Sequence, residues 1–246
     1  MEIGNSVFVN HLIPTPDGFK SAGKLSTDDY LIGNDGKPVR IKMLIRCDDD
    51  PVEMYRVSFK DRMDMVCPIT QKVMTINTND LDIKDISIGE ILKVGPVTTN
   101  GQYKYQVPTS PRIDQFGPAS HLDVEERVDI IKNGTGFKYD AVYGTVNERE
   151  ETIDLLFKDG PFVTDNLTVL FMVGTIVRSL GYIFYVESKN YVYTCTMSKS
   201  VLENKVSTIS GIEDAKETKG VVSIAVDNEK NMFIGPNLTL MYGYRS

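Results

Sequence analysis

The chain has 246 residues, of which 41% are hydrophobic, which is enough for one sizeable core or two smaller ones. Its net charge of −7 and pI near 5.0 argue against a general polyanion binder. Three cysteines without a CxxC pair argue against a disulfide framework and a zinc site, so we expect no metal and no cofactor. We find neither a membrane-spanning stretch nor a signal peptide.

The first hundred residues contain short alternating segments separated by turns. Two of them flank the pair Asp35 and Gly36, and Asp-Gly supplies the positive φ angles of a tight hairpin. Others alternate apolar and polar residues with the period of a strand. We expect strands at 30–32, 39–41, 54–59 and 72–76. Strands this short and numerous favour a strongly bent β structure over a helix bundle.

The composition changes after residue 107, where prolines, a glycine and serines form a linker-like stretch as far as residue 118. Beyond it, Asp123 is a candidate N-cap for a helix over 124–131. A second helix follows Asp165 or Asn166 and ends at Gly181, because apolar residues recur with the helical period between them. Strand-like runs surround these helices at 152–157, 182–186 and 191–197.

The middle of the chain is therefore an α+β insert between two β-rich segments, since the sequence is strand-like again from about residue 205. We expect an insert at 108–200. The aromatic residues of its last strands are expected to pack in the core and across strands, because few basic residues accompany them as base stacking would need. They are Tyr182, Phe184, Tyr185, Tyr191 and Tyr193.

Four stretches, at 6–18, 25–41, 212–213 and 221–234, resemble the first and last conserved stretches of the Hedgehog/intein (Hint) fold. The patterns Thr-Pro-Asp-Gly, Gly-x-Asp-Gly-Lys-Pro and Ala-Val-Asp-Asn-x-x-x-x-Phe occur in the order and spacing of that family. The resemblance implies a mainly β fold, a horseshoe of short bent strands built from both ends of the chain. The Hint-like domain would comprise 1–107 and 201–246, with the α+β insert between them.

The resemblance also implies a set of chemical roles. Ser6 stands at the position of the nucleophile that attacks the preceding carbonyl to form an ester. Thr70 stands where the family has a histidine that protonates the departing amide nitrogen, which a hydroxyl cannot do near neutral pH. Asn231 stands where a second histidine is usual. Tyr242 and Gly243 stand where the terminal His-Asn pair would be. Three of the four roles are then empty, namely those of the two histidines and that of the terminal pair.

The two histidines of the chain, His11 and His121, fall outside these positions. The insert resembles one repeat of a LAGLIDADG homing endonuclease at 162–167 and 175–182, where a helix ends in Ser-Leu-Gly before a strand. The helix that defines that family would fall at 126–137, where Gly136 or its neighbours replace the metal-binding aspartate. We expect the acids nearby and the cluster at 48–50 to be solvated, so no metal site is predicted.

Together these features favour a splice-inactive intein-like protein that is a structural or protein-interaction component. Elements of this kind abound in bacteriophages, so we expect a phage or viral particle, or the host cytoplasm, and other subunits as partners. One alternative is a DNA-binding remnant of a homing endonuclease, although acidic residues outnumber basic ones in 108–200. The other is autoprocessing, in which Ser6 removes the residues before it; only this second alternative implies enzymatic activity.

Overall fold

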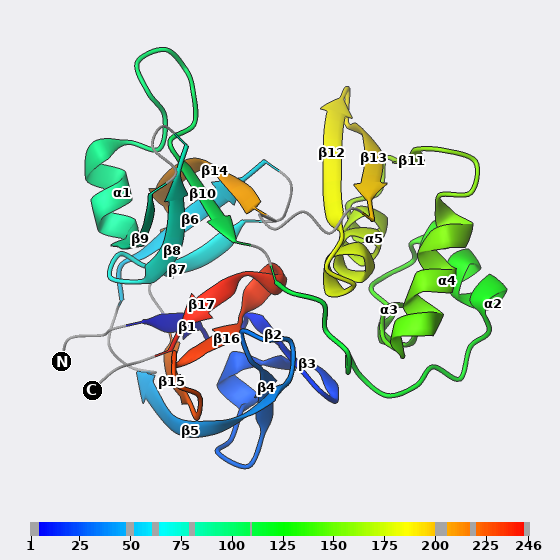
Figure 1. Cartoon of the computed structure of the whole chain (residues 1–246), viewed down its shortest axis with the longest axis horizontal. Helices are drawn as coiled ribbons and strands as arrows, with labels where there is room; N and C mark the ends of the chain where they lie inside the picture. Colours follow the sequence, from blue (N-terminus) through cyan, green and yellow to red (C-terminus); the bar gives the residue numbers. More distant parts are fainter. Residues whose placement is uncertain are drawn as a thin grey trace.

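The computed structural model describes residues 5–47, 52–60, 64–78, 82–108, 110–199, 206–216 and 220–243, apart from the side chain at position 237. Within them the chain is mainly β, with a mixed helical and β segment in the middle of the sequence (Figure 1). The predicted fold class, mainly β with an α+β insert, is confirmed. No helix among the described residues is long and apolar enough to cross a membrane.

The first sheet joins the two ends of the chain. Its strands are β1 (Ser6–Phe8), β15 (Val221–Val226), β5 (Pro38–Cys47) and β4 (Tyr30–Ile32), in this order and all antiparallel. All six residues of β15 are buried, because it pairs on both edges and lies in the middle of the packed structure. The pairing of β1 with β15 sets Ser6 opposite Ser223.

A C-terminal strand is also central to the second sheet. The order there is β7 (Met65–Pro68), β6 (Met54–Phe59), β14 (Val206–Asp214), β10 (Tyr105–Pro108), β8 (Lys72–Asn77) and β9 (Ile83–Ser87). Register shifts after Ile209 in β14 and after Ala225 in β15 mark irregularities of the bulge type, which bend and twist a strand. The expectation of short, strongly bent strands is therefore confirmed.

Two hairpins and short helices complete this β-rich part. The hairpins are β2 (Leu12–Thr15) with β3 (Gly18–Ser21) and β16 (Met232–Ile234) with β17 (Leu240–Tyr242). The helices are α1 (Ile88–Val94) and two 3-10 turns, η1 (Ala22–Lys24) and η2 (Pro236–Leu238). The hairpin predicted around Asp35 and Gly36 is confirmed as β4 and β5. Gly36 has a φ of 80°, and a side chain there would strike the carbonyl of Arg112.

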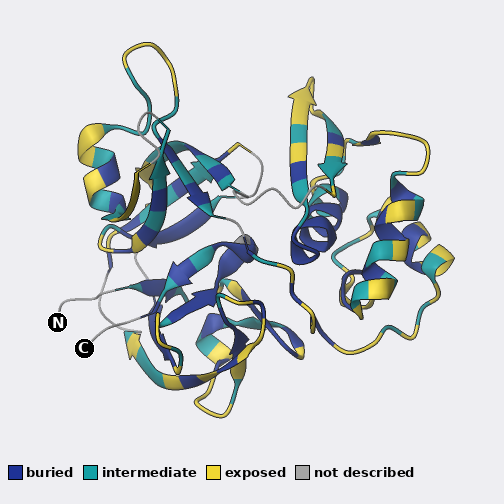
Figure 2. Ribbon diagram, viewed as in Figure 1, coloured by how far each residue is buried: buried dark blue, intermediate teal, exposed yellow. Residues whose placement is uncertain are grey.

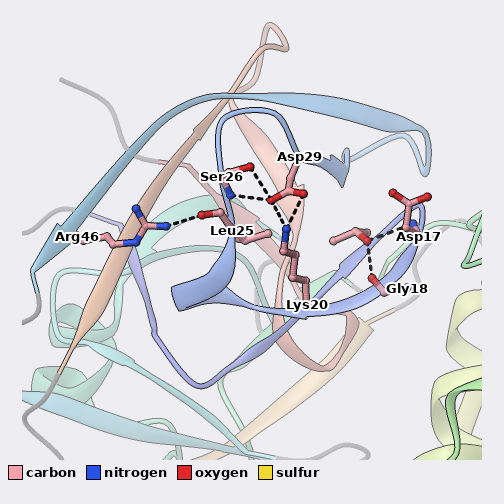
Figure 3. Close-up of polar contacts among 8 residues, drawn as sticks. Asp17, Gly18, Lys20, Leu25, Ser26, Asp29 and Arg46 are labelled. Carbon is pink, nitrogen blue, oxygen red and sulfur yellow. Dashed lines mark hydrogen bonds and ion pairs between the residues drawn. The ribbon is translucent and has the colours of Figure 1, made fainter.

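The stretches that carry the Hint resemblance near the start are held by a polar network (Figure 3). Lys20 Nζ contacts Asp29 Oδ2 at 2.6 Å, and the same oxygen accepts a hydrogen bond from the Ser26 backbone nitrogen at 2.7 Å. Burial raises the pKa of Asp29, but the hydrogen bonds from Lys20 and Ser26 outweigh it and lower this pKa overall. Nearby, the Arg46 guanidinium of β5 donates to the Leu25 carbonyl.

The insert contains helices and a three-stranded sheet in the order β11 (Phe162–Thr164), β13 (Val192–Ser198) and β12 (Ile183–Lys189). Its helices are α2 (Val124–Asn133), α3 (Tyr139–Val142), α4 (Val146–Leu156) and α5 (Leu167–Ser179). Asp123 caps α2 as predicted, and Asn166, not Asp165, caps α5. Gly181 follows α5 with a φ of 71°, so the predicted helix end is confirmed.

The strand expected at 152–157 is wrong, because this segment is the second half of α4. The helix begins at a capping box in which the Thr145 hydroxyl accepts from the Glu148 backbone and the Glu148 carboxylate accepts from the Thr145 backbone. From there the helical period places Arg149, Ile153 and Leu156 on one buried face. The apolar residues after Thr152 complete that face and do not start a strand.

Beyond Pro108, the last residue of β10, the linker-like stretch has no helix or named strand in its described residues, but it is packed into the insert. Ile113 and Phe116 are fully buried, and the Ile113 backbone nitrogen donates to the Ser179 carbonyl at 2.8 Å. Arg149, also fully buried, donates to the Ile113 carbonyl at 2.5 Å and to Ser179 Oγ at 2.7 Å. The linker-like stretch is thus a connection that is packed against the insert.

The buried apolar residues form two main clusters. Figure 2 shows that both the β-rich part and the insert contain buried segments. The larger β-rich cluster is drawn only from residues 7–107 and 209–241. The other consists mostly of insert residues and includes Ile32, Ile234 and Leu238 from the β-rich part. Tyr143 adds a further link, since its hydroxyl accepts from the Phe19 backbone nitrogen. The exact domain limits stay a prediction, because the second cluster draws on both sides of them.

Candidate functional site

Ser6 begins β1 at the place where the two ends of the chain meet. Its side chain is buried, and its Oγ shares a 2.5 Å hydrogen bond with Ser223 Oγ on β15. Its backbone nitrogen donates to Gln71 Oε1 at 3.0 Å. A hydroxyl is not a base near neutral pH, so Ser223 can orient the Ser6 hydroxyl but cannot activate it.

Gln71, and not Thr70, faces Ser6. The Gln71 side chain is fully buried, and its Nε2 donates to the Lys72 carbonyl at 2.8 Å, whereas Thr70 is exposed in the turn after β7. The residue that contacts Ser6 is therefore the one after Thr70, the residue that the motif spacing indicated. The alternation of β8 could have corrected it, because Val73 and Thr75 point inward and the same period continues back to Gln71.

Asn5 ties the start of the described chain to its end. Its Nδ2 donates to the Gly243 carbonyl at 3.1 Å, and its Oδ1 accepts from the Lys72 backbone nitrogen at 2.8 Å. Asn5, the residue before the candidate nucleophile, is thus fixed between Gly243 and the start of β8. Sequence reasoning missed this contact, because nothing local marks an asparagine as a bridge across 238 positions.

Gly243 occupies a space that is closed to any side chain. A Cβ atom added there would lie 2.8 Å from the Ile224 carbonyl oxygen and even closer to Asn231 Oδ1. The Gly243 backbone nitrogen donates to the Asn231 carbonyl at 2.6 Å. The position therefore lacks a terminal asparagine and also has no room for one.

Asn231 and Tyr242, which stand where the resemblance would place histidines, make hydrogen bonds that connect strands. Asn231 adopts a φ of 49°, and its Oδ1 accepts from the Val226 backbone nitrogen at 2.9 Å, which fixes the turn between β15 and β16. The Tyr242 hydroxyl donates to Asp85 on β9. Both side chains are thus used to connect strands.

Neither histidine is a partner of Ser6. His11 lies between β1 and β2 with its ring edge-on to Phe8, at a centroid distance of 5.8 Å, and burial lowers its pKa to about 4. His121 is exposed in the segment that leads into α2. His11 is neutral above this low pKa, and its ring contacts Phe8 and not Ser6. It therefore cannot act as a general acid for the Ser6 peptide bond.

The crevice beside Ser6 has no room for a water molecule. Asn5, Gln71, Phe233 and Tyr242 are among the residues that line it. Water would be required to hydrolyse an ester at Ser6, so the packed crevice opposes hydrolysis.

No group of three or more His, Cys, Asp or Glu side chains in the described residues could hold a metal ion. Asp140 and Asp159, the acids close to the proposed LAGLIDADG helix, are both exposed, as expected. Gly136 lies beyond the end of α2, which stops at Asn133. The acidic cluster at 48–50 lies outside the described residues.

The aromatic residues of the insert divide in a way that sequence reasoning did not predict. Phe184 is buried, and Tyr182 and Tyr193 are partly buried, as expected of core packing. Tyr185 and Tyr191 are 52% and 86% exposed, so for these two the expectation of packing in the core is wrong, although Tyr185 lies opposite Thr196 across the strands. Tyr185 is on the outer face of the sheet, and Tyr191 is at the β12–β13 turn with a φ of 62°.

No family model and no curated protein matches the chain. Among solved structures it is similar to the Msm DnaB1 intein splicing domain bound with zinc, with a TM-score of 0.41 and 11% identity over 96% of this chain and 99% of that one. It is also similar to the MchDnaB-1 intein (TM-score 0.45, 12% identity, 96% and 99% covered). The gp41-1 intein is similar as well (TM-score 0.44, 10% identity, 98% and 99% covered).

Proposed function

We infer that this chain is a splice-inactive intein-like protein that acts through contacts with other proteins, as a structural component of an assembly. The observation that carries the inactivity is the closed space at Gly243, where Ile224 and Asn231 leave no room for the side chain that would cyclise. The absence of a base at Ser223 and of an acid at Gln71 supports the same conclusion.

The role in protein contacts is supported by the outer face of the insert sheet. Val163 and Tyr185 are more than half exposed on this face, next to the exposed Tyr191 and Val192 at the end of the hairpin. A bulky residue in the left-handed region costs on the order of 1–3 kcal/mol, and such strain concentrates at functional positions. Exposed aromatic side chains are frequent anchors of protein interfaces.

The insert is proposed to be a metal-less remnant of a LAGLIDADG repeat. The helix, Ser-Leu-Gly turn and strand at α5 and β12 support this, as does the lack of an aspartate at the end of α2. Without carboxylates to hold a divalent cation, the insert would not cut DNA. If this chain shifted the electrophoretic mobility of duplex DNA, and the shift weakened steeply as the salt concentration rose, the DNA-binding alternative would be supported in place of the protein-contact role.

The experiment is to purify the largest particle made by the natural source and to measure the intact mass of this chain in it. A full-length chain in stoichiometric amount supports a structural component of a phage or viral particle. A chain found only free in the cell would refute the particle role. A chain that begins at Ser6 would refute the inactivity and establish autoprocessing.

A further inference from the structure

The hairpin of β12 and β13 leaves one edge of the insert sheet open. The strand order makes β12 outermost, with β13 on one side and no strand among the described residues on the other. The end of this hairpin extends beyond α5 (Figure 1), and residues 187–192 are exposed without interruption. An edge strand presents unpaired backbone donors and acceptors, which are a template for another strand. The edge of β12 can therefore accept a second strand.

The turn of the hairpin decides which backbone groups are directed to that edge. Asn190 and Tyr191 have φ angles of 52° and 62°, and positive φ at both central residues is what a two-residue type I′ turn requires. Such a turn closes on a hydrogen-bonded pair, here Lys189 with Val192, and these pairs alternate along an antiparallel ladder. The backbone groups of Ser188 are therefore directed away from β13 and toward the free edge.

The charges on either side of Ser188 are complementary to themselves. Glu187 and Lys189 are exposed on one face of β12, and neither has an ion pair with the described residues. If two copies of β12 pair antiparallel with Ser188 opposite Ser188, each Glu187 lies opposite the other copy's Lys189, which is favourable. A register centred on Glu187 would oppose like charges, and one centred on Val186 would set Glu187 opposite Tyr185. Charge complementarity therefore selects the register centred on Ser188.

We propose that the partner at this hairpin is a second copy of the chain, paired edge to edge through β12 with Ser188 on the two-fold axis. The inference rests on the proposed function, because it names the partner for the contact role of the exposed hairpin. The same register brings Tyr191 of each copy next to Tyr185 of the other. This contact gives the Tyr191 side chain a role at a turn position that favours glycine.

Two charge reversals in the full-length chain test the pairing by sedimentation velocity over a range of concentrations. Glu187→Lys opposes two positive charges in both halves of the contact, and Lys189→Glu opposes two negative charges. We expect each variant alone to self-associate about tenfold more weakly than the wild type. An equimolar mixture of the two should associate like the wild type, because every charge then faces its opposite. Thr196→Lys is the matched control, since Thr196 is exposed on the central strand and not at the edge.

A cysteine cross-link tests the register. Directly opposed residues have a Cα separation that a disulfide can span, so oxidation should link two copies of Ser188→Cys more than the wild type or Thr196→Cys. Stronger linking through Val186→Cys overturns the register. A wild type that stays monomeric, or a mixture that associates no better than either charge variant, overturns the pairing and leaves the proposed function in place. The proposed function fails separately, if the chain is found only free in the cell.

Discussion

Acidification is expected to destabilise this fold through His11. The ring is partly buried with its edge against Phe8, and its Nδ1 is a buried atom with no hydrogen-bond partner among the described residues. Burial lowers the pKa of His11 from 6.5 to about 4. Between these values the unfolded chain binds a proton that the folded chain does not, so the free energy of unfolding falls as the pH falls through this range.

The size of the expected loss of stability follows from the difference between the unfolded and folded pKa values of His11. Each pH unit within it removes about 1.4 kcal/mol from the free energy of unfolding, so the loss between about pH 7 and about pH 5 is on the order of 2 kcal/mol. Urea unfolding at both pH values would measure it, in wild type and in His11→Phe. The variant keeps an aromatic ring against Phe8 but binds no proton.

The difference between the two proteins isolates His11. Asp29, Glu90 and Glu148 also have lowered pKa values and lose their contribution as the pH falls below the ordinary carboxyl range, but they do so in both proteins. Equal losses of stability in wild type and His11→Phe between about pH 7 and about pH 5 would show that His11 is not the source.

Three further changes test the packing. Gly243→Asn should lower the free energy of unfolding by about 1–3 kcal/mol in chemical denaturation, because the new side chain overlaps Ile224 and Asn231, and its intact mass should show no cleavage. Arg149→Met should cost about 2–4 kcal/mol, since the carbonyls of Ile113 and Gly144 lose a buried charged donor; an unchanged thermal midpoint would contradict this. Asp123→Ala removes the cap of α2 and should cost about 1 kcal/mol by the same denaturation assay.

Local signals predicted much of the fold. The Asp35–Gly36 turn, the alternation of 54–59 and the cap at Asp123 each act within a few residues, and each is present in the structure. The helix α4 was missed although its signal is equally local, since Thr145 and Glu148 have the spacing of a capping box. The apolar residues after Thr152 gave a stronger but misleading indication of a strand.

The site was predicted only in part, because its contacts join residues far apart in the chain. The resemblance indicated Ser6, Asn231 and Gly243, and the structure brings the Asn231 and Gly243 backbones into contact, with Ser6 close by across Asn5. Ser223 lies beside Ser6 because β15 pairs with β1, and Gln71 lies there because of the direction in which the turn after β7 points its last residue. No spacing along the sequence encodes the first of these, whereas the alternation of β8 indicates the second.

The meeting of residues 5 and 243 also determines how the protein responds to mechanical force. A pull applied across these points first loads the hydrogen bond between Asn5 and Gly243. It then peels β1 from β15 beginning at Ser6 and β17 from β16 beginning at Tyr242. In this geometry backbone hydrogen bonds break one after another and not all at once. The ends would therefore open at low force, while α5 and the insert sheet stay off the path of the load.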